Sequence, residues 1–167
     1  MLWQGGGLPQ AWAGQTAWRI LDTRFSRGFN FLSTCQAWKS DPLRPHMLHY
    51  VALTSAPPSL DELRASAEFF PELRELLQEL APQWFGLLPG FHRFTLDKGW
   101  VLLTLCVGDL TAMLRQQQFN ADTVYLDPGQ AAPLDSTAAS AWRVRLAVWK
   151  PLKMVWEIVA VAPYGEL

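Results

Sequence analysis

The segment from Trp18 to Leu32 constrains the fold of this chain more than any other. It begins with a mostly apolar run of strand length, Trp18 to Asp22, and apolar residues recur at helical spacing from Phe29 onward. A strand that passes through a tight loop into a helix is how nucleotide-binding α/β domains begin, with the ligand held at the loop. The segment therefore predicts a ligand site between residue 23 and Gly28.

The residues that follow predict a βαβ unit. Asp41 and Pro42 end the helix, and Met47 to Thr54 is a second apolar run of strand length. Such a unit makes its two strands parallel and its crossover right-handed in nearly all cases. Ser59 with Glu62 three residues later is a capping box, which predicts that an amphipathic helical layer with an acidic face begins there.

The second half of the chain predicts a mixed sheet. Phe91 to Leu96 and Trp100 to Val107 are β-rich runs on either side of a short turn that contains Gly99, which indicates an antiparallel hairpin. A strand is expected at 122–127 and another at 154–161. Helices are expected at 110–117 and 136–149.

Composition limits the classes of protein that need to be considered. The chain has 167 residues, half of them apolar, and a net charge of −1, which fits one folded domain and gives no overall basic signal for nucleic acid. Cys35 and Cys106 lie in apolar segments, so buried thiols in a reducing cytoplasmic protein are expected. His46, His49 and His92 share no metal-like spacing, so no metal site is expected. No apolar run approaches the roughly 20 residues that span a bilayer, and the N-terminus does not resemble a signal peptide.

Three positions are expected at one edge of the sheet. They are the 23–28 loop, Asp109 after the hairpin, and Asp127 after the strand at 122–127. Each follows the carboxyl end of a strand, and open α/β sheets bind their ligands outside those ends.

Several motifs, taken in order, resemble the methyltransferase domain of the bifunctional bacterial tRNA 5-methylaminomethyl-2-thiouridine biosynthesis enzyme, the MnmC family. The motifs are Asp22 to Leu32, Gln36 to Trp38, Leu48 to Val51, Leu88 to Arg93, Gly108-Asp109 and Tyr125 to Asp127. The resemblance covers roughly residues 3 to 127 and depends on the ordered co-occurrence of motifs that are weak singly.

The resemblance implies an α/β fold: a Rossmann-like S-adenosylmethionine-dependent methyltransferase sheet with helices on both faces and an inserted antiparallel hairpin. It implies S-adenosylmethionine as the cofactor and tRNA as the partner. Many members of the family also carry a FAD-dependent oxidase domain, and neither that domain nor a membrane segment is expected in this chain. The whole chain, 1–167, is expected to be one domain, with an N-terminal arm at 1–17, a family-like core at 18–127 and a divergent segment at 128–167. Because that last segment is short for the family, an uncovered sheet edge and self-association through it are expected.

The resemblance also implies roles for single residues. The glycine-rich cofactor loop of the family falls on residues 22–31, Thr54 takes the place of the acid that holds the ribose, Asp109 faces the adenine amine, and Asp127 lies at the catalytic edge. The cofactor-binding residues implied are Asp22, Thr23, Gly28, Asn30, Thr54 and Asp109, and the catalytic residue is Asp127.

Two main hypotheses of function follow. The first is methyl transfer from S-adenosylmethionine to the aminomethyl group of wobble 2-thiouridine in tRNA. The second is a relative that keeps the fold without catalysis and acts as a binding module. Arg24 and Ser26 favour the second, since the family has glycine at both positions, as do Thr54 and Pro128. A general tRNA-binding role, with Arg24 and Arg27 near phosphate, is a third.

Overall fold

The computed structural model describes residues 8–110, 112–113, 121–126, 145–148 and 157–160. Its elements in chain order are β1 (Ala17–Asp22), α2 (Phe29–Ser40), β2 (Met47–Thr54), α3 (Leu60–Ala67), η1 (Pro71–Leu73), α4 (Arg74–Leu80), η2 (Ala81–Gln83), β3 (Gly90–Leu96), η3 (Asp97–Gly99), β4 (Val101–Val107), β5 (Thr123–Leu126), β6 (Arg145–Val148) and β7 (Glu157–Ala160).

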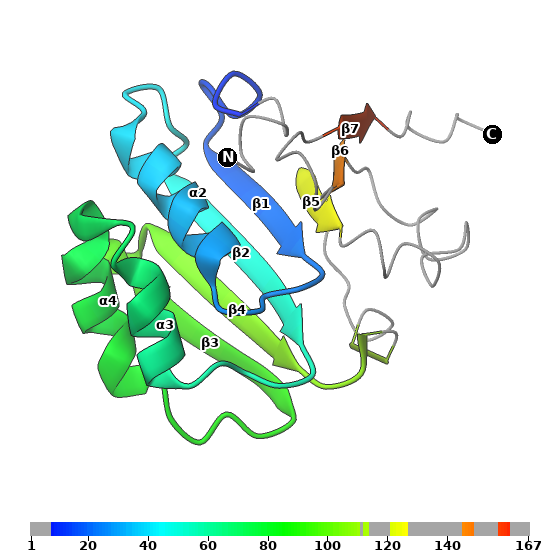
Figure 1. The fold of residues 1–167 in the computed structure, drawn as a ribbon. Coiled ribbons are helices and arrows are strands. Elements are labelled where there is room, and N and C mark those ends of the chain that lie inside the picture. The colour runs from blue at the N-terminus through cyan, green and yellow to red at the C-terminus, as the bar shows by residue number, and fades with distance from the viewer. Residues whose placement is uncertain (1–7, 111, 114–120, 127–144, 149–156, 161–167) are drawn as a thin grey trace.

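The strands form one sheet in the order β3-β4-β2-β1-β5-β6-β7 (Figure 1). The strands from β4 to β6 in that order run parallel, while β3 and β7 pair antiparallel at the two ends. The predicted βαβ unit and the predicted hairpin of β3 and β4 are therefore confirmed. The helix expected at 136–149 is wrong for Arg145–Val148, because these residues pair with β5 as a strand.

The central strands are apolar on both faces, as expected of parallel strands covered on two sides. In β2, Leu48, Tyr50 and Ala52 belong to the larger core cluster, while the alternate residues Val51 and Leu53 belong to a second cluster. The sheet therefore separates two layers of apolar packing, and it fixes which side chains of each strand reach which layer.

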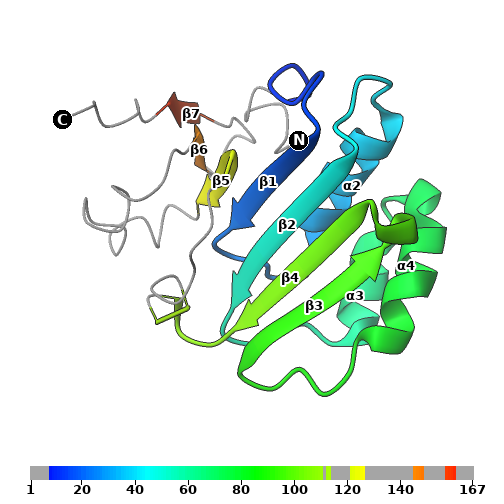
Figure 2. The same cartoon turned by 180° about the vertical axis from the view of Figure 1, so that it is seen from behind.

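Helices α2, α3 and α4 cover one face of the sheet, as the front and back views show (Figures 1 and 2). The predicted capping box begins α3: the Ser59 hydroxyl accepts from the Glu62 amide at 3.2 Å, and the Glu62 carboxylate accepts from the Ser59 amide at 2.9 Å. On the opposite face, Leu110 and Met113 pack against the second cluster. They lie where a helix was expected to begin.

The strand order reverses beside β1. From β1 the chain passes through α2 to β2 on one side of it, and β5 pairs with its other side. This is a topological switch point, and the carboxyl ends of β1, β2, β4 and β5 meet at the same edge of the sheet. The Rossmann-like α/β sheet expected from the sequence is therefore the fold of the described residues.

In the described part of the chain, no helix is both long and apolar enough to cross a membrane. The cytoplasmic location and the self-association at the sheet edge stay predictions.

His49 makes the stability of the fold depend on pH. It lies half-buried on β2 and shares a 3.1 Å hydrogen bond with the Thr104 hydroxyl of β4. Burial lowers the pKa of His49 below its usual 6.5, and the charges of Arg93 and Arg19 lower it further. The unfolded chain therefore takes up a proton before the folded chain does, and we expect the free energy of unfolding to fall as the pH drops below 6.5.

Urea unfolding at several pH values between 7.5 and 5 measures the slope of the free energy of unfolding against pH. His49→Gln should flatten it, whereas His46→Gln, at an exposed histidine of the loop before β2, should leave it unchanged. A slope that His49→Gln does not alter would assign the pH dependence to other groups.

Candidate functional site

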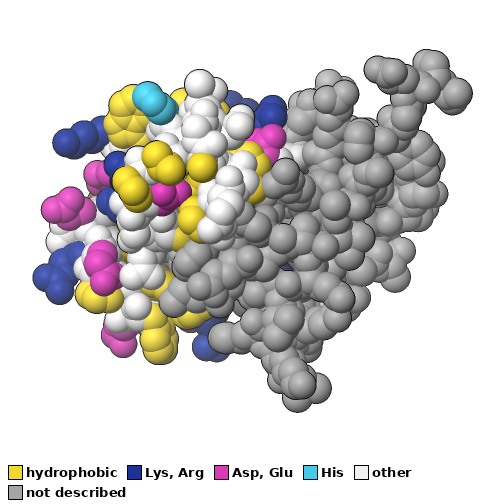
Figure 3. Space-filling view, turned by 90° about the horizontal axis from the view of Figure 1, so that it is seen from above, with side chains coloured by type: hydrophobic (Ala, Val, Ile, Leu, Met, Phe, Trp, Pro, Cys, Tyr) yellow, Lys and Arg dark blue, Asp and Glu magenta, His cyan; other side chains and the backbone are white. Residues whose placement is uncertain are grey.

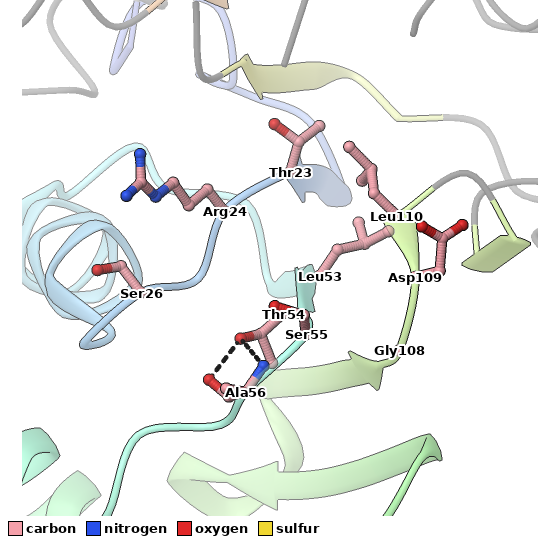
Figure 4. Close-up of a pocket in the computed structure, with 10 residues that line it drawn as sticks. All are labelled: Thr23, Arg24, Ser26, Leu53, Thr54, Ser55, Ala56, Gly108, Asp109 and Leu110. Carbon is pink, nitrogen blue, oxygen red and sulfur yellow. Dashed lines mark hydrogen bonds between the residues drawn. The ribbon is translucent and has the colours of Figure 1, made fainter. Parts of the chain in front are cut away.

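A cavity of about 600 Å³ lies at the carboxyl edge of the sheet (Figure 4). Its walls are the residues that come directly after, or end, three parallel strands: β1, β2 and β4. The lining residues are Thr23, Arg24, Ser26, Leu53, Thr54, Ser55, Ala56, Gly108, Asp109 and Leu110. The volume is within the range of about 300–1,000 Å³ that is usual for small-molecule sites.

Asp22 holds the loop that forms the first wall. Its side chain is buried, and it accepts hydrogen bonds from the Tyr50 hydroxyl at 2.7 Å, the Arg24 amide at 2.9 Å and the Asn30 side chain at 3.4 Å. Burial, with the charge of Asp22 nearby, raises the pKa of Tyr50, so the phenol stays protonated and donates. Asp22 and Asn30 therefore lie behind the cavity and fix the path of the loop, rather than lining the cavity.

Gly28 also lies outside the cavity wall. It precedes α2 with φ 77°, and a Cβ placed there would come within 2.6 Å of Leu63 Cδ1 and 3.2 Å of Phe25 Cζ. The absent side chain leaves room for core residues of α3 and of the loop. Packing on the helical side therefore accounts for this glycine, whatever the cavity binds.

Arg24 and Ser26 stand at the two positions where the family that the sequence resembles has glycine. Both are exposed, and both line the cavity. Ser26 has φ 50°, in the left-handed region, whereas Arg24 is not among the described residues with positive φ. Only Ser26 thus occupies a backbone conformation that glycine adopts more easily.

The second wall contains Thr54, whose hydroxyl belongs to a local turn. It donates to the Ala56 carbonyl at 2.7 Å and accepts from the Ala56 amide at 3.2 Å (Figure 4). The proton of this hydroxyl is therefore engaged within the loop. One acceptor lone pair of the oxygen remains for a ligand.

The third wall contains Gly108 and Asp109. Gly108 has φ 151°, and a Cβ there would lie 2.8 Å from Met113 Cε. Asp109 is exposed, and one of its carboxylate oxygens accepts from the Ala112 amide at 2.9 Å. It caps the turn that follows β4, and its second oxygen is the acceptor that this wall offers to a ligand.

Of the predicted site residues, the structure brings Thr23, Thr54 and Asp109 together around the cavity. Thr23 is tied to β5, because its amide and its hydroxyl both donate to the Tyr125 carbonyl. Asp127, the predicted catalytic residue, lies outside the described residues. Sequence reasoning missed several residues that line the cavity. Each lies at the end of a predicted strand or shortly after it, and that position could have identified them. They are Leu53, Ser55, Ala56, Gly108 and Leu110.

Among the described residues, no group of three or more His, Cys, Asp or Glu side chains is placed to hold a metal ion. In the part of the chain that the structure describes, the polar groups around the cavity are hydroxyls, backbone groups, the guanidinium of Arg24 and the carboxylate of Asp109. This set fits a polar organic ligand.

Comparison with known proteins identifies the relatives of the chain. Residues 71–133 match a family described as S-adenosyl-L-methionine-dependent methyltransferase. The chain is 63% identical over 138 residues to the tRNA 5-methylaminomethyl-2-thiouridine biosynthesis bifunctional protein MnmC of Albidiferax ferrireducens. It is 53% identical over 136 residues to MnmC of Polaromonas sp.. The chain is related to the methyltransferase domain of the MnmC proteins.

The two alignments cover 83% and 80% of this chain but only 23% and 21% of the MnmC proteins. The chain thus spans about a fifth of the length of these relatives. A solved structure, the crystal structure of MNMC2 from Aquifex aeolicus, aligns with a TM-score of 0.47 and 16% identity over 73% of this chain and 36% of that chain.

The role of Gly28 in packing is tested by substitution with alanine. Gly28→Ala adds backbone strain and the 2.6 Å contact with Leu63, whereas Gly14→Ala at φ 74° adds a similar strain with nothing within 4 Å. We expect Gly14→Ala to cost about 1–2 kcal/mol and Gly28→Ala roughly 1–3 kcal/mol more, measured by urea unfolding. Equal losses would show that packing does not require glycine at residue 28.

The strain at Ser26 is tested by a matched pair of glycine substitutions. Ser26→Gly should raise the free energy of unfolding by about 0.5–1 kcal/mol, since glycine tolerates positive φ. Arg24→Gly should lower it, because glycine adds freedom to the unfolded chain and removes whatever the Arg24 side chain contributes to the fold. A lower free energy of unfolding for Ser26→Gly would contradict the inference that the backbone of Ser26 is strained.

Proposed function

We propose that this chain binds S-adenosylmethionine in the cavity at the carboxyl edge and methylates the aminomethyl group of wobble 2-thiouridine in tRNA. The observation that carries the proposal is the position of the cavity. It lies beside the switch point of the sheet and is lined by the ends of β1, β2 and β4. Ligands of open α/β sheets bind there, and the matching family is described as S-adenosyl-L-methionine-dependent.

Each wall of the cavity suits one part of this cofactor. The loop of Thr23, Arg24 and Ser26 would hold the methionine end, with Arg24 supplying a cation for its carboxylate. Thr54, with its one open lone pair, would accept from a ribose hydroxyl. The second carboxylate oxygen of Asp109 would accept from the adenine amine, and the half-buried side chain of Leu110 would offer an apolar surface to the ring.

When bound, S-adenosylmethionine supplies an electrophilic methyl group. The amine that receives it must be neutral, since its lone pair forms the new bond to carbon. As the methyl group is transferred, that nitrogen must also lose a proton. We assign orientation of the amine and acceptance of this proton to Asp127, which follows the last residue of β5 in the sequence.

The competing function is a cofactor-free binding module that retains the fold. Two observations favour it: the strained Ser26 and the internal turn that engages the hydroxyl of Thr54. Replacing both Arg24 and Ser26 with glycine separates the two functions. Increased cofactor affinity would indicate a site that has lost function, and decreased affinity a working variant of the loop.

Isothermal titration calorimetry with S-adenosylhomocysteine, the demethylated cofactor, tests the proposal directly. We expect heat of binding, and we expect Thr54→Asp to tighten it by about 10-fold, because a carboxylate accepts from both ribose hydroxyls. Ser55→Asp adds the same charge at the next position of the loop and serves as the matched control, with little expected effect.

The absence of both heat and thermal shift at millimolar ligand would refute cofactor binding. Equal effects of Thr54→Asp and Ser55→Asp would reject the assignment of Thr54 to the ribose.

Methylation of tRNA that carries aminomethyl-thiouridine, followed by mass spectrometry of its nucleosides, tests the substrate. An Asp127→Asn variant that keeps full activity would remove the role given to Asp127.

A further inference from the structure

A second cavity lies at the opposite, amino edge of the sheet. It has a volume of about 410 Å³. Its lining residues are Trp38, Trp100, which directly precedes β4, and five residues of the loop between α2 and β2: Asp41, Pro42, Arg44, Pro45 and His46. Figure 3 looks onto this edge, where apolar side chains reach the surface beside cationic ones. Eight residues of β2 separate the two edges, a span of roughly 25 Å.

Arg44 is held in place at this cavity. Its guanidinium lies 4.6 Å from the centre of the Trp38 ring, and one of its nitrogens donates to the Lys39 carbonyl at 2.7 Å. Trp38 is itself buried and donates to the Pro45 carbonyl at 2.8 Å. A guanidinium fixed in this way loses less conformational entropy on binding an anion, and its other N–H groups remain as donors.

Trp100 gives the cavity an aromatic surface. It is 47% exposed, although most of the tryptophans in the described part of the chain are buried. The His46 ring meets it edge-on, with 6.1 Å between the ring centres. An exposed indole beside a fixed arginine is the arrangement by which proteins stack an unpaired base and hold its phosphate.

Among the described residues that line this cavity, the one carboxylate is already engaged. Asp41 accepts from the Trp12 indole at 2.6 Å through one oxygen and from the Leu43 amide at 2.9 Å through the other. It therefore shapes the loop. The exposed acids of α3 and α4 would repel a polyanion, so the amino edge is the more favourable surface for RNA.

We propose that this amino-edge cavity binds one unpaired nucleotide of an RNA strand. Its base stacks on Trp100 and its phosphate receives hydrogen bonds from Arg44. The inference rests on the proposed function in taking tRNA as the source of that nucleotide. It adds a contact at the edge of the sheet opposite the cofactor cavity, where it would position the RNA and take no part in methyl transfer.

Fluorescence anisotropy with a labelled 12-nucleotide uridine RNA tests the contact on the whole chain. Trp100→Ala should weaken binding by roughly 5- to 100-fold, as expected for the loss of one stacked base, and Trp100→Phe should restore most of the affinity. Arg44→Gln should weaken binding and reduce the slope of log affinity against log salt by about 0.7, the loss of one phosphate contact. Arg64→Gln, which removes an exposed cation of α3, is the matched control and should leave both unchanged.

Unfolding curves for each variant show whether an altered affinity reflects loss of the fold, and the rescue by Trp100→Phe guards against the same error. RNA binding that is absent in the original chain, or that Trp100→Ala and Arg44→Gln leave unaltered, would overturn the inference. Competition by uridine monophosphate at concentrations similar to those of the RNA would identify a free nucleotide as the ligand and reject the RNA contact.

Calorimetry with S-adenosylhomocysteine on the same samples keeps this inference distinct from the proposed function. Cofactor binding with no effect of Trp100→Ala on RNA affinity would reject the inference alone. RNA binding that depends on Trp100 in a chain that takes no cofactor would reject methyl transfer and leave the RNA contact standing.

Discussion

A buried carboxylate at the end of β1 determines the geometry of the carboxyl edge. Asp22 is almost inaccessible to solvent, and three of its donors come from different parts of the chain: the next loop, α2, and the neighbouring strand β2 through Tyr50. A buried charge is tolerated only when hydrogen bonds replace its lost hydration, so these partners are held together. The loop that faces the cavity is therefore positioned from behind, by contacts that no ligand needs to supply.

The strands could be predicted from the sequence because the signal is physical and local. Apolar runs bounded by turn residues gave β1, β2 and the β3–β4 hairpin, and the capping residues of α3 were readable as a pair. The segment at Arg145–Val148 was predicted as helix and is a strand, since its pairing with β5 is a tertiary contact that outweighs local pattern in so short a run. The position of the cavity could also be predicted, because the topology of a parallel sheet alone brings the carboxyl ends of its strands together.

Individual side chains of the site were less predictable, because their direction depends on neighbours. The sequence assigned Gly28 to a cofactor loop, whereas its missing Cβ makes room for Leu63, a residue of α3 that no local pattern connects with it. Thr54 lines the cavity, yet its turn with Ala56 could not be anticipated. Ser26 and Arg24 looked equivalent as replacements of glycine, and only the backbone torsions separate them.

The contact between the position of Gly28 and Leu63 has a consequence for how such chains can diverge. The two residues share one volume: the space that glycine leaves empty is filled by the end of a leucine on another helix. A larger residue at 28 would have to bear the strain of its positive φ, and the end of the Leu63 side chain would have to shift or be shortened, so the sizes of the two residues are linked. Among related sequences, the two positions should vary together, and a change in α3 would reach the loop beside the cavity without touching any ligand.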